Sequence, residues 1–384
     1  MHRTGFLKKY GSHIIYVSIL GIFTLGFFIL SSVYAFNTMK PRTVVLENSL
    51  FSSNSPTDTK IDLQIKNVIK LDTPYPVWNP RIVDNNSLVF RTAEQGSKRY
   101  NYKICALNIN TNIMFEIDSK NSYELLVSPD GKKVLYFDSS LEKGIFKTFL
   151  YDMQTKEIRK TFDGSASLML PDGNRYIGML NDSLFIQNIS TGERENLITI
   201  TEFHQKAGLL WTTQLIPMVN QKLWNFKFSS DGHKIYFIGP YVEGTAVYML
   251  DLENKNSLEV LIKGRITGLA SLTNGNLLLH GNINGEDGIF IYNMQNKGYK
   301  NLLRGNIYYF DITSDGNIAY ISNNNKGIAE LHVAHLGDTT IESDKIVYSD
   351  IKNVSFLEWS RNGKMLFCVS DRMNESSIFR FTFQ

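Results

Sequence analysis

The chain of 384 residues is long enough for one large or two ordinary domains with a sizeable core. Its formal net charge is +3, but five of its bases lie before residue 43, and no acidic residue precedes Glu47. The other 35 of the 40 Lys and Arg residues are matched by 37 Asp and Glu residues, so the body of the protein is not basic. This composition excludes the basic surface of a typical nucleic-acid-binding protein, and no nucleic-acid partner is expected.

The first predicted element is a helix over 14–36, an uncharged and mostly apolar stretch of 23 residues. Its length predicts a membrane-spanning signal anchor, because about 20 apolar residues of helix cross a bilayer. The basic residues before it place the tail over 1–13 in the cytoplasm, and the rest of the chain outside it as a single-pass membrane protein. The alternative is a signal peptide cleaved near Ala35 and a secreted protein, since Val33-Tyr34-Ala35 resembles a cleavage site.

The segment over 37–59 is predicted to be a polar stalk. Its SSNSPTDT stretch at 52–59 has the Ser, Pro and Asn bias of a flexible connector. The remaining residues, 60–384, form the predicted folded domain.

Seven turn pairs recur along this domain at a nearly constant spacing. Their second residues are Asn86, Gly131, Gly173, Gly232, Gly275, Gly316 and Gly363. Five of the six steps between them fall within 41–47 residues, and one is longer. Asp-Gly and Asn-Gly pairs between apolar runs indicate tight hairpin turns, because Gly adopts positive φ without a Cβ clash. The Asp residues of these pairs are interpreted as turn formers, not as catalytic groups.

Each period contains four short strand patterns. The fourth repeat, for example, reads LWNFKF, KIYFIG, GTAVYMLDL and SLEVLIKG. Four strands per period of about 40–45 residues are typical of a β-propeller blade. The sequence therefore predicts an all-β, seven-bladed β-propeller over 60–384. Six blades are the alternative, because the first and last turns depart from Asp-Gly.

The repeats SPDGKKVLYF at 128–137, LPDGNRYIGM at 170–179 and SSDGHKIYFI at 229–238 resemble those of TolB-type, WD-repeat-like β-propellers. The resemblance covers roughly residues 60–384. It implies a fold, and it does not identify a ligand.

The ends of the domain predict how the ring closes. The last repeat stops at Gln384 without a fourth strand, and the strand-like segment at 60–71 has no repeat of its own. We expect this N-terminal strand to complete the last blade, which leaves no long edge exposed. The same closure puts Cys105 and Cys368 in adjacent blades. Both are interpreted as apolar core residues, with a single disulfide between them as the alternative.

The longest step between turns places about 17 additional residues at roughly 200–222. Apolar and aromatic side chains concentrate there, which suggests a partner-binding patch or a lid over the channel. A short helix buried against its own blade is the competing interpretation. The candidate partner-binding residues are His204, Leu209, Leu210, Trp211 and Met218.

No motif indicates a metal site, a cofactor or a known catalytic set. His332 and His335 are three residues apart in a strand-like run, so they point to opposite faces and do not share one ion. Among the strands expected to line the channel in repeats two to six, Glu124 and Asp311 are the acidic residues.

The sequence thus favours a membrane-tethered β-propeller that binds a protein or a cell-envelope component through its loop face. The alternative is a hydrolase at the channel mouth that acts on a glycan or a lactone. A cluster of charged side chains in the channel would favour this enzyme.

Overall fold

The structure is a computed structural model. It describes residues 21, 24–26, 63–95, 100–120, 122, 124–138, 146–209, 223–242, 244–254, 257–372 and 375–384. The chain divides into two compact units, Met1–Ser53 and Asn54–Gln384.

The location predicted for the chain, a single-pass membrane protein, is corrected by the structure. Within the part of the chain that the structure describes, no helix is long and apolar enough to cross a bilayer. Of the predicted span over 14–36, only Gly21 and the helical residues 24–26 are described. The tail over 1–13, the cleavage site near Ala35 and the stalk over 37–59 lie outside the described residues.

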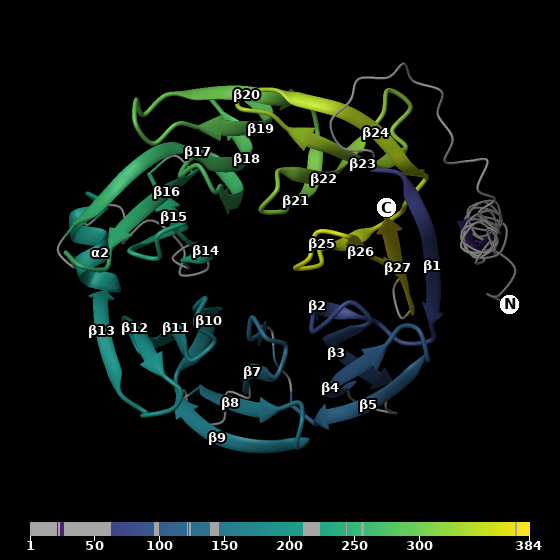
Figure 1. Cartoon of the computed structure of the whole chain (residues 1–384), viewed down its shortest axis with the longest axis horizontal. Coiled ribbons are helices and arrows are strands. Elements are labelled where there is room, and N and C mark those ends of the chain that lie inside the picture. The colour runs from purple at the N-terminus through teal and green to yellow at the C-terminus, as the bar shows by residue number, and fades with distance from the viewer. Residues whose placement is uncertain are drawn as a thin grey trace, which may run out of the picture. The chain divides into compact units, whose positions relative to one another are not determined.

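The second unit is built from antiparallel sheets arranged in a ring (Figure 1). Three consecutive four-stranded sheets comprise β2 (Trp78–Ile82), β3 (Ser87–Gln95), β4 (Tyr100–Asn108) and β5 (Ile113–Asp118); β6 (Leu125–Val127), β7 (Lys133–Asp138), β8 (Lys147–Asp152) and β9 (Glu157–Asp163); and β10 (Ser165–Met169), β11 (Arg175–Leu180), β12 (Ser183–Asn188) and β13 (Arg194–Thr199).

The helix α2 (Ile200–Lys206) leads from the third of these sheets into a seven-stranded sheet. This sheet comprises β14 (Trp224–Phe228), β15 (Lys234–Tyr241), β16 (Gly244–Asp251), β17 (Leu258–Ser271), β18 (Leu277–Ile283), β19 (Glu286–Tyr292) and β20 (Tyr299–Arg304). The next sheet comprises β21 (Ile307–Ile312), β22 (Asn317–Asn323), β23 (Ala329–Leu336) and β24 (Ile341–Ser349). The last comprises β25 (Val354–Trp359), β26 (Met365–Arg372), β27 (Glu375–Phe383) and β1 (Ile65–Thr73).

The seven-stranded sheet consists of two halves that share β17. The first half of this strand, up to Gly264, pairs with β16, and the second half, from Arg265, pairs with β18. No loop separates the two halves, so one strand is both the outer strand of one half and the inner strand of the next.

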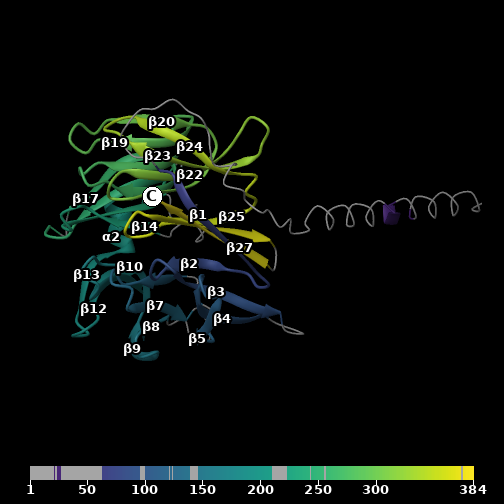
Figure 2. The ribbon, with the colours of Figure 1, turned by 45° about the vertical axis from the view of Figure 1, so that its right-hand side comes forward.

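The strands nearest the axis contact one another in a closed circle of β2, β6, β10, β14, β17, β21 and β25. We denote the strands of each sheet a to d, from the axis outward. The a–b and c–d connections then form one face of the ring, the turn face, and the b–c and d–a connections form the other, the loop face. Figure 2 shows the ring turned by 45°, with α2 beside the sheets of β13 and β14.

The predicted turns connect strands a and b of the successive sheets. In the turn between β6 and β7, Ser128 Oγ donates to the Asp130 carboxylate at 2.6 Å and accepts from the Lys133 N–H at 2.9 Å. The Ser229 and Ser360 turns repeat this arrangement. The hydrogen bond from Ser128 lowers the pKa of Asp130. These contacts agree with the interpretation of the turn Asp residues as turn formers.

The predicted closure of the ring is confirmed. The N-terminal strand β1 pairs antiparallel with β27 in a register that runs from Ile65 opposite Phe383 to Thr73 opposite Ser376. It thereby supplies the fourth strand of the last sheet.

Hydrophobic clusters fill the spaces between neighbouring sheets. One cluster, for example, joins Val89 and Ile104 of one sheet to Val134 and Tyr136 of the next. The middle strands are covered on both faces, so β15 is buried over nearly its whole length, whereas the outer strand β9 is largely exposed.

Cys105 and Cys368 both belong to this core and form no disulfide. They lie on β4 and β26, in sheets that are adjacent in the ring. Burial raises the pKa of the Cys368 thiol far above its ordinary range. The interpretation of both residues as apolar core residues is confirmed.

Candidate functional site: the loop face and the central channel

The connection between β13 and β14 carries the residues that the sequence singles out for partner binding. It begins with α2, which a capping box initiates. Thr199 Oγ1 accepts from the Glu202 backbone N–H at 3.1 Å, and the Glu202 carboxylate accepts from the Thr199 backbone N–H at 2.8 Å. This motif fixes the point at which the chain leaves the sheet and starts the helix.

The structure places two of the five candidate residues in the core. His204 is 7% exposed and Leu209 is 1% exposed. The other three candidates, Leu210, Trp211 and Met218, lie outside the described residues. The partner-binding role of the set stays a prediction, and the described part of α2 matches the competing interpretation of a helix packed on its own sheets.

The described ends of this connection are anchored in one hydrophobic cluster. Phe203, Leu209 and Leu223 are all buried in the cluster that fills the space between the sheet of β10–β13 and β14–β16. The His204 ring lies 5.5 Å from the Phe203 ring, and burial lowers the pKa of His204. This side chain therefore contributes to the core as a neutral imidazole.

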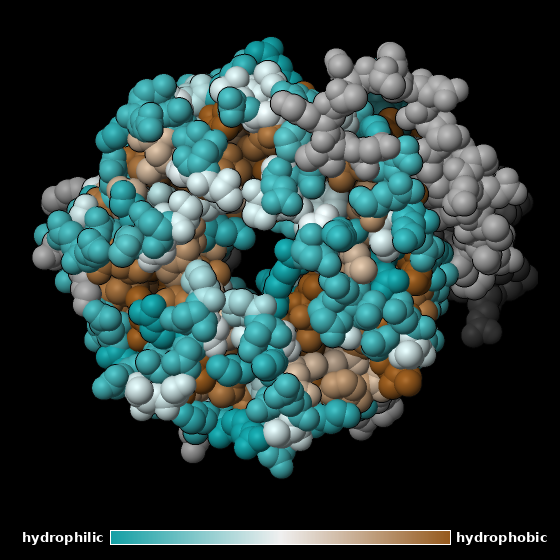
Figure 3. Space-filling view, in the orientation of Figure 1, coloured by the Kyte–Doolittle hydropathy of each residue, from teal (hydrophilic) through white to brown (hydrophobic). Residues whose placement is uncertain are grey.

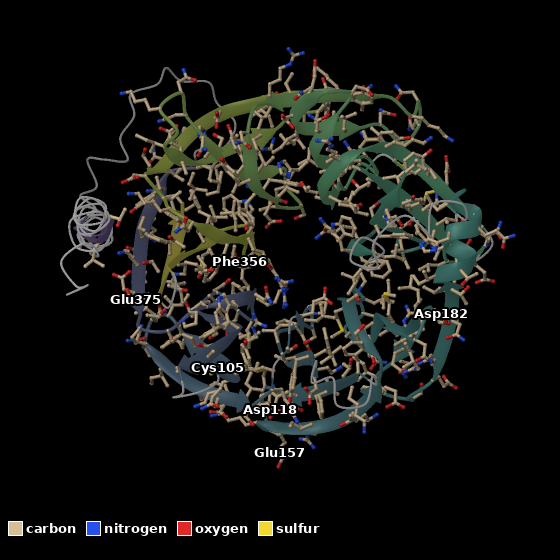
Figure 4. The ribbon with its side chains drawn as sticks, turned by 180° about the vertical axis from the view of Figure 1, so that it is seen from behind. Cys105, Asp118, Glu157, Asp182, Phe356 and Glu375 are labelled. Carbon is tan, nitrogen blue, oxygen red and sulfur yellow. The ribbon has the colours of Figure 1, made fainter. Side chains whose placement is uncertain are left out.

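The central channel is the second candidate site. Figure 3 shows an opening at the centre of the ring, with hydrophilic residues over much of its rim. In Figure 4, Phe356 of β25 lies near the axis, whereas Glu157 of β9 lies on the outer rim. Side chains that the inner strands direct to the axis are therefore surrounded by protein and reach solvent only along the channel.

Five ionisable side chains of the inner strands and their turns form a charged group, which we name the channel cluster. Its members interact electrostatically with one another, and they are Arg81 of β2, Lys227 of β14, Asp311 of β21, Glu358 of β25 and Arg361 just after β25. Three cations face two acids, so the cluster has a positive net charge.

Glu358 is the acid of the cluster whose pKa is raised to near neutrality. Burial raises its pKa to about 7, Arg81 opposes this rise, and the negative charge of Asp311 adds to it. Lys227 and Arg361 also lower the pKa. A carboxyl group with a pKa near neutrality exists in both protonation states at physiological pH, as a general acid or base requires.

Asp311 is the acid that the sequence predicts in the channel. Burial raises its pKa, while a hydrogen bond from the Trp359 backbone N–H, 2.7 Å from Oδ2, lowers it. The same hydrogen bond links β21 to β25. The structure brings Asp311 together with Glu358, and it places Glu124 half-buried just before β6.

Sequence reasoning missed Glu358, because it considered the channel strands of repeats two to six only. The available signal was an acid near the end of VSFLEW, the apolar inner strand of the last repeat. Its position one residue before the buried Trp359 places the two side chains on opposite faces of the strand.

Arg361 links two turns of the turn face. Its guanidinium donates to the backbone carbonyl oxygens of Ser128, at 2.5 Å, and Pro129. These carbonyls belong to the turn between β6 and β7, so the side chain reaches past the sheet of β2–β5. Burial lowers the pKa of Arg361, and the Glu358 carboxylate opposes this shift.

The two histidines at 332 and 335 have different partners. His332 Nδ1 lies 3.2 Å from Asp344 Oδ1, and its ring stacks on Tyr320 at 4.6 Å. His335 Nδ1 lies 3.5 Å from Asn317 Oδ1. Over the described ranges, no group of three His, Cys, Asp or Glu side chains is arranged to hold a metal ion.

Comparisons with known proteins identify the fold. No protein-family model matches the chain, and no curated protein matches it. A chain in the crystal structure of the mitotic checkpoint complex is 10% identical with a TM-score of 0.54, over 89% of this chain and 99% of that one. The β-propeller domain of the Trilobed protease from Pyrococcus furiosus is 13% identical with a TM-score of 0.55, over 80% and 93%.

TolB from Acinetobacter baumannii is 13% identical with a TM-score of 0.45, over 78% of this chain and 80% of that one. At these identities the likeness concerns the fold. The β-propeller fold that the predicted resemblance implies is confirmed.

Proposed function

We propose that the protein is a seven-bladed β-propeller that binds a partner protein through its loop face. Seven blades follow when each half of the seven-stranded sheet is counted as one blade with β17 shared. The seven inner strands that contact one another in a circle support this count. Propellers suit this role because they present wide, rigid surfaces whose loops vary independently of the sheets.

Exposed apolar side chains at the loop-face ends of three different sheets carry the proposal. Phe146, Val242 and Tyr308 are 38%, 53% and 44% exposed. They lie at the b–c or d–a ends of three different sheets, and thus on the loop face. The turn face also carries exposed apolar side chains at the c–d connections of two sheets, namely Ile113, Met114 and Tyr299, whereas its a–b turns carry none among the described residues. Exposed apolar side chains at the ends of rigid elements are typical anchors for a protein partner.

Crosslinking in cells tests the proposal. We expect a reproducible partner of the wild-type protein to be lost when Val242→Asp places a charge on the loop face. Ile158→Asp is the matched control, because Ile158 is similarly exposed, at 46%, on the outer strand β9. Deletion of residues 210–220 tests the predicted candidates Leu210, Trp211 and Met218. A partner that survives both loop-face changes, or is lost equally with the control, contradicts the proposal.

The channel cluster favours a second candidate function, a hydrolase that acts on a glycan or a lactone. The observation behind it is Glu358, whose pKa of about 7 suits proton transfer at neutral pH. The positive charges of Arg81, Lys227 and Arg361 beside it are suited to stabilise negative charge that develops on a substrate oxygen.

This second function is tested with the purified protein on a panel of oligosaccharides and lactones. If it is correct, hydrolysis is detected and Glu358→Gln abolishes it, while the circular dichroism spectrum is unchanged. Glu375→Gln serves as a control, because Glu375 is exposed on β27. Absence of hydrolysis across the panel, or equal activity of both variants, would argue for binding alone.

A further inference from the structure

A groove on the turn face, remote from the loop face, consists of two adjoining clefts. The larger cleft has a volume of about 560 Å³ and the smaller about 380 Å³. Both are lined by Asn274 and Asp338, so they form one continuous depression. Its walls are the a–b and c–d turns of the sheet half β17–β20 and of the sheet β21–β24.

Amide side chains dominate the smaller cleft. Their oxygens are already occupied within the protein. Asn274 Oδ1 accepts from the Asn276 backbone N–H at 3.0 Å, and Asn276 Oδ1 accepts from the Met294 N–H at 3.2 Å. Asn293 Oδ1 accepts from the Asn296 N–H at 3.1 Å.

These contacts fix the orientation of each amide, because a backbone N–H requires the side-chain oxygen to face it. Asn296 is oriented in the same way, because its Oδ1 accepts from the Gly298 N–H at 2.8 Å. The NH₂ groups of these four side chains make no hydrogen bond to any described residue. Four oriented donors thus line one cleft.

An aromatic ring and two acceptors complete the groove. Tyr299 lines the smaller cleft and is 42% exposed. Its ring is positioned by an edge contact with Phe290, 6.0 Å between ring centroids. Asp338, shared by both clefts, and Asp315, in the larger one, are exposed carboxylates and thus hydrogen-bond acceptors.

We propose that this groove binds a neutral saccharide. Sugar hydroxyls accept hydrogen bonds from fixed amide NH₂ groups and donate to carboxylates, and the apolar face of a sugar ring packs on an exposed aromatic ring. A phosphate or sulfate group fits less well, because the two carboxylates oppose an anion and Lys300 already donates to the Thr339 carbonyl oxygen at 3.0 Å. The site is distinct from the loop face and the channel cluster.

Isothermal titration of the full chain with maltohexaose, cellohexaose, mannohexaose and chitohexaose tests this proposal. We expect saturable binding of at least one of these probes. Asn293→Asp keeps the oxygen that caps the turn and removes the NH₂ donor, so the fold is retained while affinity falls about three- to tenfold. Tyr299→Ala removes the stacking ring and is expected to weaken binding about tenfold.

Asn362→Asp is the matched control. Asn362 Oδ1 likewise accepts from a backbone N–H two residues on, that of Lys364 at 3.1 Å, in the a–b turn between β25 and β26, which lies outside the groove. This variant is expected to bind the probe as the wild type does, with melting temperatures of all three variants recorded to confirm folding. The proposal is overturned if none of the four probes binds, if Asn293→Asp and Tyr299→Ala bind normally, or if the control loses as much affinity.

Discussion

Thr73 and Ser376, which are 303 residues apart in the sequence, are joined by a hydrogen bond of 2.9 Å from Thr73 Oγ1 to the Ser376 carbonyl oxygen. The Ser376 hydroxyl accepts from the Val77 backbone N–H at 2.8 Å and donates to the Asp371 carboxylate at 2.6 Å. Both Thr73 and Ser376 are buried. The ring is therefore closed by a buried polar network in addition to the strand pairing of β1 with β27.

Ser376→Ala should weaken this closure. The substitution leaves the buried Val77 N–H without its acceptor, and an unsatisfied buried donor costs about 1–3 kcal/mol. We expect the free energy of unfolding in urea to fall by that amount. Ser314→Ala is the control, because Ser314 is exposed and its hydroxyl makes one long contact of 3.4 Å. Equal effects of the two substitutions would contradict the assigned role of Ser376.

Glu358 should make stability depend on pH. Its pKa is about 7 in the folded protein and 4.5 as an ordinary side chain, so between these pH values the folded state holds a proton that the unfolded state has lost. Stability due to this group is therefore fully present below pH 4.5 and decreases as the pH rises to about 7, by up to about 3 kcal/mol.

Urea unfolding of wild type and Glu358→Gln at pH 5 and pH 8 measures this effect. The variant should gain stability relative to wild type as the pH rises, because Gln stays neutral. If the two proteins change in parallel, the channel does not perturb Glu358 as described.

Gly131 and Gly232 distinguish two destabilising effects of adding a side chain in these turns, namely backbone strain at positive φ and a steric clash with the neighbouring sheet. Both residues have positive φ, +73° and +75°. A Cβ on Gly131 would lie 2.6 Å from the Val83 carbonyl oxygen of the neighbouring sheet, whereas one on Gly232 would meet nothing within 4 Å. We expect Gly232→Ala to cost about 1 kcal/mol for backbone strain alone, and Gly131→Ala to lower the melting temperature clearly further. Equal losses would show that the turns of adjacent sheets do not pack as described.

The two cysteines should be unreactive in the folded protein. Cys105 is 1% exposed and Cys368 is 0% exposed. A thiol reacts as its thiolate, and burial disfavours that form. Ellman's reagent should detect almost no thiol in native protein and both thiols in guanidinium chloride. Rapid native labelling, or a missing thiol after denaturation without reductant, would contradict the buried reduced state.

The ring architecture was predictable because its signals are local and repeated. A turn such as Ser229-Ser230-Asp231-Gly232 forms through contacts within a few residues, and the same chemistry recurs at one spacing. The closing strand was also predictable, since the last repeat lacks a fourth strand. The continuous strand β17 was not, because the residues around Gly264 read as the end of one strand and the start of another.

The candidate sites were predicted less completely. His204 and Leu209 stand in an insertion rich in apolar and aromatic side chains, but the sequence does not show which face of a short helix packs inward, and both are buried. Glu358 acquires its pKa from Arg81, Lys227 and Asp311, which other strands contribute. The amide groove likewise depends on turns from two sheets. Properties that arise between sheets are invisible to a repeat-by-repeat analysis.

The continuous strand β17 makes one region of the ring intolerant of insertions. A d–a loop elsewhere absorbs added residues without disturbing the strands that it joins. In β17, one added residue near Gly264 would shift the register with β16 or β18 and turn the following side chains to the wrong face. Ile266, which is fully buried, would then point away from its cluster. Loop grafts, fused domains and new chain termini should therefore be placed in the other connections, and this strand should be kept intact.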